Sequence, residues 1–188
     1  MNTPNKLTVV RMIMTPVFLA VLLLQFLPHR YLIACIIFII ASLTDLVDGK
    51  LARKNNQVTT FGKFLDPIAD KILVIAAILY FLKMGISDVW VPMLILTREF
   101  IVTSVRLVAS GSGKVIAASF WGKAKTVSQM AAIIIILLLQ EAAQYAFLPA
   151  MFPLGLLCEV LLWISTVLTV ISGIQYVWNY REYINTTK

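Results

Sequence analysis

The sequence predicts an all-α integral membrane protein with six transmembrane helices, preceded by a short juxtamembrane helix, and with both termini in the cytoplasm. Two observations indicate this fold class. Apolar residues make up 60% of the 188 residues and charged residues only 13%, against roughly half and about a quarter in ordinary soluble domains. Runs without any charge also recur along the whole chain, without the polar and apolar alternation that a membrane β-barrel requires. We therefore expect one membrane domain over residues 1–188.

The six predicted spans are charge-poor segments of about the length that crosses a bilayer as a helix, roughly 20 residues. They lie at residues 7–27, 31–53, 65–83, 88–108, 122–140 and 154–178. Thr3 and Pro4 have the pattern of a helix N-cap followed by a proline in the first turn, which predicts the short juxtamembrane helix. Between the last two spans, residues 141–153 are apolar but contain Pro149 and Pro153, which indicates an interfacial or re-entrant segment.

Lysine and arginine are distributed unevenly between the alternate sides of these spans. One side carries Lys6, Arg11, Lys50, Arg53, Lys54, Lys63, Lys71, Arg106, Lys114, Lys123, Lys125, Arg181 and Lys188. The other side carries only Arg30 and Lys83. Because basic residues concentrate on the cytoplasmic side, both termini are expected there, in a multi-pass protein of the cell (plasma) membrane. The net charge of +7 favours contact with anionic membrane lipids, and nucleic acid is not expected as a partner.

Four aspartates interrupt the apolar sequence at the junction of the second and third spans. Asp45 and Asp48 are three residues apart, so they occupy one face of a helix. Asp66 and Asp70, four residues apart, occupy one face of the next helix. The polar stretch 54–61 is short enough to fold the two helices into an antiparallel hairpin, which brings both pairs to the cytoplasmic face. A like-charged cluster of this kind persists when cations bind among its members.

The ligand chemistry of this cluster indicates which cations would bind. Carboxylate oxygens suit hard divalent ions such as Mg²⁺ or Mn²⁺, and zinc is disfavoured because the sole histidine, His29, lies on the opposite side. Two metals that share carboxylates would bind a diphosphate and assist in-line displacement. The alternative is a set of solvated helix ends paired with basic neighbours, but four acids at helical spacing favour a functional cluster. Gly49 and Gly62 indicate either close substrate approach or close helix packing.

The full spacing of this segment is Asp45-x2-Asp48-Gly49-x2-Ala52-Arg53-x8-Gly62-x3-Asp66-x3-Asp70. It resembles, without departure, the signature of the CDP-alcohol phosphatidyltransferases, which are integral membrane enzymes of phospholipid synthesis. The N-terminal segment of that family is similar to Pro4-Asn5-x-Leu7-Thr8-x2-Arg11. Its bacterial phosphatidylglycerophosphate synthases have segments similar to Thr97-Arg98-Glu99-Phe100, with Arg106, and to Trp121-Gly122-Lys123-x-Lys125-Thr126.

The resemblance implies roles for the residues of these motifs. The ligands of two divalent cations, Mg²⁺ or Mn²⁺, would be Asp45, Asp48, Asp66 and Asp70. Asp70 would also be the general base, which takes the proton of the acceptor hydroxyl as the oxygen attacks the β-phosphorus of CDP-diacylglycerol and expels CMP. The CDP-diacylglycerol site would be formed by Asn5, Thr8, Asp45, Gly49, Ala52, Arg53 and Gly62. The resemblance also suggests a homodimer.

Basic residues at the cytoplasmic ends of the fourth and fifth spans indicate an acceptor that carries a phosphate. They are Arg98, Arg106, Lys123 and Lys125. Their other reading is anchoring of the spans by positive charge at the cytoplasmic face. Together with the resemblance they favour sn-glycerol 3-phosphate, with inositol phosphate as the main alternative acceptor. A cation-binding transporter or channel is disfavoured, because its charges usually lie near the bilayer midplane and its halves often repeat.

Overall fold

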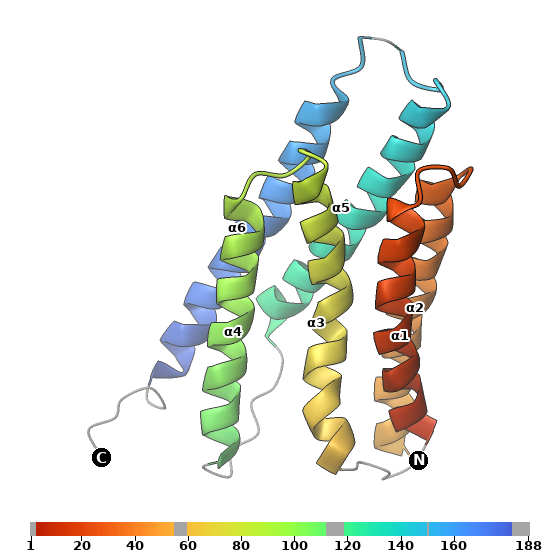
Figure 1. Cartoon of the computed structure of the whole chain (residues 1–188). Coiled ribbons are helices and arrows are strands. Elements are labelled where there is room, and N and C mark those ends of the chain that lie inside the picture. The colour runs from red at the N-terminus through yellow and green to blue at the C-terminus, as the bar shows by residue number, and fades with distance from the viewer. Residues whose placement is uncertain (1–2, 55–59, 112–118, 150, 182–188) are drawn as a thin grey trace. The chain divides into compact units, whose positions relative to one another are not determined.

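A computed structural model describes the backbone of residues 3–54, 60–111, 119–149 and 151–181. Side chains are described for residues 8–44, 69, 71–109, 119–149 and 151–181. Within the described backbone the chain forms six α-helices and no strand (Figure 1). The helices are α1 (Thr3–Leu23), α2 (Arg30–Lys54), α3 (Thr60–Lys83), α4 (Trp90–Gly111), α5 (Phe120–Gln144) and α6 (Leu154–Asn179).

The all-α class is confirmed, and each predicted span coincides with one helix apart from shifts of a few residues at the ends. The prediction of a separate juxtamembrane helix is wrong, because α1 runs without a break from Thr3 to Leu23. Pro4 stands in the first turn of α1, where a missing N–H leaves no hydrogen bond unmade. The next proline is Pro16, so nothing in between interrupts the helix.

Residues 141–153 are divided between a helix end and a set of turns. The helix α5 continues to Gln144, so Glu141 is helical and does not belong to a separate segment. The described residues that follow, up to Pro153, form turns, a bend and irregular backbone. The helix extends further than predicted because Glu141 to Gln144 contain no proline or glycine, the residues that most often end a helix.

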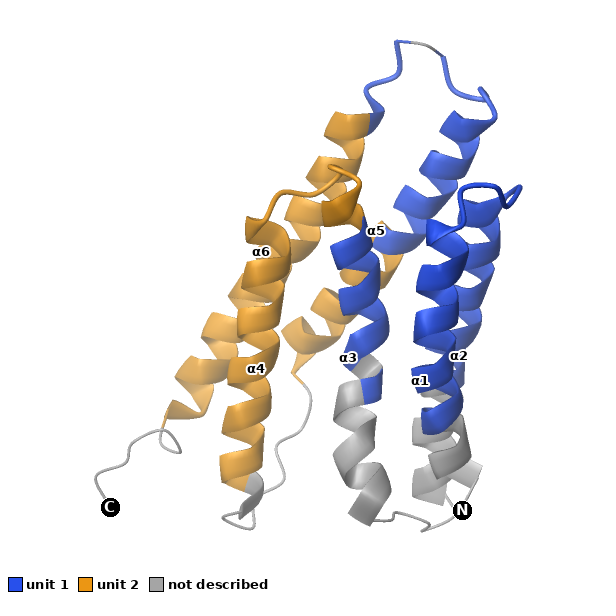
Figure 2. Ribbon diagram, viewed as in Figure 1, with its two compact units in different colours: residues 1–80, 133–154 blue, residues 81–132, 155–188 orange. Residues whose placement is uncertain are grey.

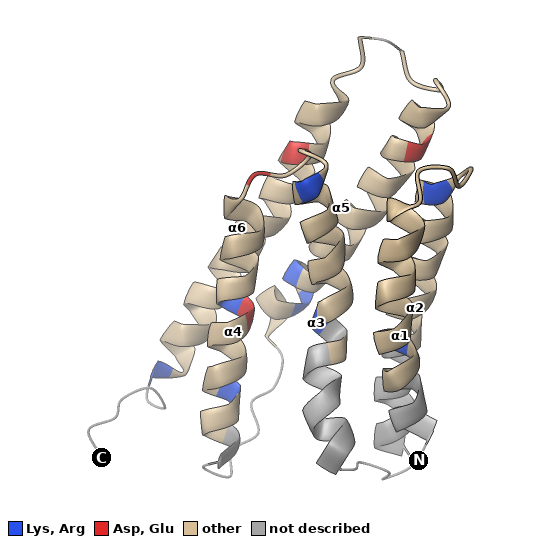
Figure 3. Ribbon diagram, viewed as in Figure 1, with Lys and Arg blue, Asp and Glu red and all other residues tan. Residues whose placement is uncertain are grey.

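The helix α6 has an inside-out pattern of polarity compared with a helix on the surface of a soluble protein. Its buried side chains include Ser165, Thr166 and Ser172, each at most 1% exposed. Large aliphatic side chains such as Ile164 and Ile174 are 53% and 65% exposed. Aliphatic side chains are stable on the outside when lipid surrounds them. Among the described residues, α5 and α6 are both long and apolar enough to cross a membrane, and Figure 3 shows how sparse charge is along the helices.

The chain divides into two compact units (Figure 2). Unit 1 consists of residues 1–80 and 133–154, and unit 2 of residues 81–132 and 155–188. The boundary between the units therefore falls inside α3, inside α5 and after the first residue of α6. That the whole chain is one domain stays a prediction.

In unit 1, α1 and α2 pack against each other. The rings of Phe18 and Phe38, from the two helices, have centroids 5.9 Å apart. Ala34 of α2 is fully buried, as expected where small side chains let membrane helices approach closely. The hydroxyl of Tyr80 donates a hydrogen bond to the carbonyl oxygen of Leu22 at 3.3 Å, so α3 is tied to the end of α1.

In unit 2, α6 contacts both α4 and α5. Val102 and Val105 of α4 form a buried apolar cluster with Tyr176 of α6. Toward α5, Nε2 of Gln129 donates a hydrogen bond to Oγ1 of Thr169 at 3.0 Å. The polar residues of α6 therefore point toward the neighbouring helices, which explains why they are buried.

The end of α3 illustrates how a single glycine shapes a helix terminus. Gly85 has a φ of +70°, in the left-handed region that glycine adopts without steric cost. Its N–H donates to the carbonyl of Leu82 at 3.1 Å, and the N–H of Ile86 donates to the carbonyl of Phe81 at 2.9 Å. These two bonds form a Schellman motif, which satisfies carbonyl groups that the end of the helix leaves without partners.

Candidate active site

The four aspartates lie in two consecutive helices of unit 1. Asp45 and Asp48 are in α2, one turn apart, and Asp66 and Asp70 are in α3, also one turn apart. The backbone is helical at all four positions, so each pair belongs to one face of its helix. Residues 55–59, which join the helices, lie outside the described part of the chain, as do the four side chains.

The other residues predicted for the CDP-diacylglycerol site come from α1, α2 and α3. Those with a described backbone but side chains outside the described set are Asn5, Gly49, Ala52, Arg53 and Gly62. Thr8 of α1 is described and is 4% exposed. It shares one face of α1 with Arg11 and Thr15, which are 3% and 4% exposed. The N-terminal half of α1 therefore has a buried polar face that includes Thr8.

The donor atoms available for a metal can be compared with the predicted cations. Among the residues with described side chains, no group of three His, Cys, Asp or Glu is placed to hold a metal ion. His29 is paired with Glu141, and Cys35 and Cys158 are buried in the apolar interior and are not in a disulfide. The aspartates of α2 and α3, whose side chains lie outside the described set, stay the predicted ligands. Their carboxylate oxygens suit hard divalent cations, so the chemistry of the set fits Mg²⁺ or Mn²⁺.

Two of the predicted phosphate-binding residues converge on one carboxylate in unit 2. Nη1 of Arg98 donates a hydrogen bond to Oε1 of Glu99 at 3.0 Å, and Nζ of Lys125 donates to the same oxygen. The side chains of Arg98 and Glu99 are 10% exposed and that of Lys125 is 8% exposed. Buried charges are unfavourable unless they are paired. Glu99 therefore stabilises two cationic side chains in a place that is largely closed to water.

The Arg98 side chain is constrained along its length by α6. Its Nη2 donates to Oγ of Ser172 at 2.7 Å. Its Cγ lies 2.7 Å from the position that a Cβ would take at Gly173, so a larger residue there would collide with it. Nε of Arg98 is buried and has no hydrogen-bond partner within the described structure. A buried guanidinium with a donor left over can bind an anion, since buried donors are almost always satisfied.

Arg98, Glu99, Lys125 and Ser172 are called the Glu99 cluster below. The other two predicted phosphate-binding residues, Arg106 and Lys123, have exposed side chains. Among the described contacts, no hydrogen bond or ion pair joins Arg106 or Lys123 to the cluster. The structure thus brings together two of the four basic residues and leaves the other two at the surface.

Sequence reasoning did not assign Glu99, Ser172 or Gly173 to the site. A signal for Ser172 was present, because Ser165, Thr169 and Ser172 recur at helical spacing in an otherwise apolar segment. That spacing predicts a buried polar face on α6. Glu99 and Gly173 carry no comparable periodic signal, because their importance lies in contacts with Arg98 that only the fold creates.

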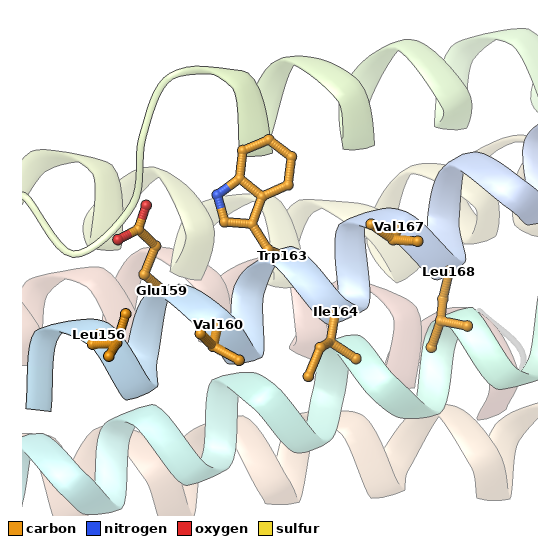
Figure 4. Close-up of a pocket in the computed structure, with 7 residues that line it drawn as sticks. All are labelled: Leu156, Glu159, Val160, Trp163, Ile164, Val167 and Leu168. Carbon is orange, nitrogen blue, oxygen red and sulfur yellow. The ribbon is translucent and has the colours of Figure 1, made fainter. Parts of the chain in front are cut away.

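A cavity of about 590 Å³ lies along α6 and is separate from these residues (Figure 4). It is lined by Leu156, Glu159, Val160, Trp163, Ile164, Val167 and Leu168. Every lining residue belongs to α6, and none is a predicted site residue. Its wall is apolar apart from Glu159, so it offers no group of polar side chains that could hold a diphosphate.

Comparison with known proteins gives consistent matches over almost the whole chain. A family described as CDP-alcohol phosphatidyltransferase matches residues 1–171. A CDP-diacylglycerol--glycerol-3-phosphate 3-phosphatidyltransferase of Bacillus subtilis is 40% identical, over 99% of this chain and 98% of its own. A protein of the same name from Rickettsia bellii is 37% identical over 97% of each chain. A probable phosphatidylglycerophosphate synthase of Mycobacterium tuberculosis is 40% identical over 94% of this chain and 80% of its own.

Proposed function

We propose that this chain transfers the phosphatidyl group of CDP-diacylglycerol to sn-glycerol 3-phosphate. The chain belongs to the CDP-alcohol phosphatidyltransferase family. The products are phosphatidylglycerol phosphate and CMP. The observation that carries the proposal is the match to the Bacillus subtilis relative, which is 40% identical over 99% of this chain. The aspartate spacing in α2 and α3 supports the same reaction.

The membrane setting is part of the proposal. All six helices would span the plasma membrane, with both termini and the site facing the cytoplasm, within one domain over residues 1–188. The uneven distribution of lysine and arginine supports this orientation, and the inside-out polarity of α6 supports a lipid environment. The lipid substrate would enter from the bilayer and the water-soluble acceptor from the cytoplasm. A homodimer, as the family resemblance suggests, would be the functional assembly.

The aspartates would carry out the chemistry. Asp45, Asp48 and Asp66 would hold a pair of divalent cations, with Asp70 contributing to one of them. When bound, these cations supply positive charge against the diphosphate and the leaving group. A carboxylate oxygen of Asp70 would accept the proton of the acceptor hydroxyl. The acceptor oxygen then forms a bond to the β-phosphorus, the bond from that phosphorus to the bridging oxygen breaks, and CMP leaves with the bonding electrons.

Gly49, Ala52, Arg53 and Gly62 would shape the site around the cytidine diphosphate, and α1 would close over it. Of the α1 residues, Thr8 is already buried and Asn5 lies one turn before it. Glycine at two of these positions would let the nucleotide approach the helix backbone closely. These residues would bind and orient the donor and take no part in proton transfer.

The acceptor phosphate would bind at the Glu99 cluster. Arg98 has a buried Nε without a partner in the described structure, and a phosphate oxygen would satisfy that donor. Lys125, held by the same oxygen of Glu99, would add a second positive charge. Arg106 and Lys123, at the surface, would attract the dianionic acceptor from solution. Inositol phosphate carries the same anionic group and is the alternative acceptor.

The test is a product assay on the detergent-purified full chain with CDP-diacylglycerol and either Mg²⁺ or Mn²⁺. Glycerol 3-phosphate, inositol phosphate, inositol and serine would be supplied in parallel, and the lipid products identified by mass spectrometry. We expect CMP release only when glycerol 3-phosphate is the acceptor. EDTA should abolish this release, and added Mg²⁺ or Mn²⁺ should restore it. Release only with another acceptor would refute the acceptor assignment. Absence of release with every acceptor would contradict the transferase and favour a cation transporter.

A further inference from the structure

We propose that α6 positions the acceptor-binding arginine: Gly173 leaves the space that the Arg98 stem occupies, and Ser172 holds its guanidinium. Both residues would then control the affinity for the acceptor without touching the acceptor. The inference rests on the proposed role of Arg98 in binding the acceptor phosphate. It assigns a function to α6, which contains none of the predicted site residues.

The space at Gly173 is specific to the Arg98 stem. A Cβ at position 173 would lie 2.7 Å from Cγ of Arg98, 3.6 Å from its Cβ and 3.9 Å from its Cδ. Carbon atoms at 2.7 Å overlap, since their favourable separation is about 3.5–4.0 Å. The three nearest heavy atoms to that position all belong to Arg98, so the missing side chain at 173 leaves room for the Arg98 stem.

Arg98 cannot relieve such a collision by a small movement of its end. Cγ is close to the backbone, and the guanidinium beyond it is fixed at two points. Nη1 donates to Glu99 at 3.0 Å and Nη2 donates to Ser172 at 2.7 Å. Any side chain at 173 would therefore force the stem to adopt another rotamer, and the guanidinium would lose one or both of these bonds.

Fixing the guanidinium in advance has a direct effect on binding. A free arginine side chain has many rotamers, and ordering it on binding opposes association. In this structure two donors are already engaged and the side chain is 10% exposed, so little ordering remains. The unsatisfied Nε is then held in one place. A phosphate bound at Arg98 would therefore meet a preorganised donor. A variant that displaces this donor by about 1 Å should lower the efficiency of the reaction steeply.

The primary test is the Gly173→Ala substitution, with Gly155→Ala as its matched control. Gly155 is in the same helix, and a Cβ added there would meet nothing within 4 Å. We expect Gly173→Ala to raise the apparent KM for glycerol 3-phosphate about tenfold. The KM for CDP-diacylglycerol should stay unchanged within about twofold. Gly155→Ala should leave both KM values at those of the wild type. Equal rises in both KM values would overturn the proposal, because they would indicate a general packing defect.

A double-mutant cycle with Arg98→Ala tests whether Gly173 acts through Arg98. Without the Arg98 stem there is nothing for the new methyl group to displace. We expect Gly173→Ala to have no further effect on the KM for glycerol 3-phosphate, or on the melting temperature, in the Arg98→Ala background. Independent effects in the two backgrounds would overturn the positioning role.

Ser172 gives a second pair of variants: Ser172→Ala lacks the hydroxyl group, and Ser172→Thr keeps it and adds one methyl group. We expect Ser172→Ala to raise the KM for glycerol 3-phosphate several-fold and Ser172→Thr, which keeps a hydroxyl, to restore most of the affinity. If Ser172→Thr binds glycerol 3-phosphate as weakly as Ser172→Ala does, Ser172 has no positioning role.

The outcomes separate this inference from the function on which it rests. If Arg98→Ala leaves the KM for glycerol 3-phosphate unchanged, the acceptor role of Arg98 is wrong and the positioning role is overturned with it. If Arg98→Ala raises that KM but the Gly173 and Ser172 variants leave it unchanged, the acceptor role stands and only the positioning role is overturned.

Discussion

Nδ1 of His29 lies 2.6 Å from Oε1 of Glu141, joining the turn before α2 to the last part of α5 across 112 residues of sequence. The other oxygen of Glu141 accepts a hydrogen bond from the N–H of Leu32 at 3.2 Å. Leu32 is in the first turn of α2, so a carboxylate from α5 satisfies one of the N–H groups that a helix start leaves free. The rings of His29 and Tyr145 also stack, with centroids 4.4 Å apart.

The first prediction concerns this contact. Glu141→Ala leaves the Leu32 N–H and the His29 ring without their partner, and should destabilise the protein by about 1–3 kcal/mol. We expect a lower melting temperature in detergent with the KM values of both substrates unchanged. Glu159→Ala is the control, because Glu159 is also an acid but is exposed on α6. Equal melting temperatures for the two variants would contradict a stabilising role of Glu141.

The second prediction concerns the general base. Asp70→Asn keeps the size of the side chain but removes its ability to accept a proton, so kcat should fall by at least about 100-fold. The melting temperature and helix content of the variant should stay close to those of the wild type. CMP release under saturating substrates measures the effect. If the variant keeps wild-type turnover, Asp70 is not the base.

The third prediction compares a buried with an exposed arginine. Arg98→Ala should raise the KM for glycerol 3-phosphate at every salt concentration, because a buried guanidinium is poorly screened. Arg106→Ala should raise the KM for glycerol 3-phosphate less. Because Arg106 is exposed and salt screens its charge, this rise should disappear as the salt concentration increases from about 0.05 to 0.5 M. Steady-state kinetics over that range, with the KM for CDP-diacylglycerol as the internal control, measures both. A salt-independent effect of Arg106 would place it in direct contact with the acceptor.

The fourth prediction concerns the end of α3. Gly85 has a φ of +70° and nothing within 4 Å of an added Cβ, so Gly85→Ala tests backbone conformation without a steric clash. An L-residue in the left-handed region costs about 1–2 kcal/mol, and the melting temperature should fall accordingly. Gly155→Ala is the matched control, since its φ is not in that region and its surroundings are also open. A melting temperature equal to that of the control would contradict the Schellman geometry.

The type and approximate bounds of the six long helices could be predicted from the sequence, because charge-poor runs and helical spacing are local properties of the chain. The aspartate spacing follows the same logic: a separation of three or four residues predicts one helix face wherever the helix lies. Errors occurred where local signals were ambiguous. Pro4 suggested a separate helix, although proline in a first turn is compatible with one continuous helix, and α5 extends beyond its predicted end to Gln144.

The sequence by itself thus determined the all-α class and the helical spacing of the four aspartates, and it predicts their metal-binding chemistry and the anionic character of the acceptor. The tertiary structure decided which basic residues share a carboxylate and what holds them there. Glu99 and Lys125 are 26 residues apart, and Arg98 and Ser172 are 74 apart. The physical reason is that hydrophobic periodicity reports which face of a helix is buried but not which residues of another helix lie opposite. Helix packing in unit 2 makes Glu99 a shared partner and Gly173 the space for Arg98.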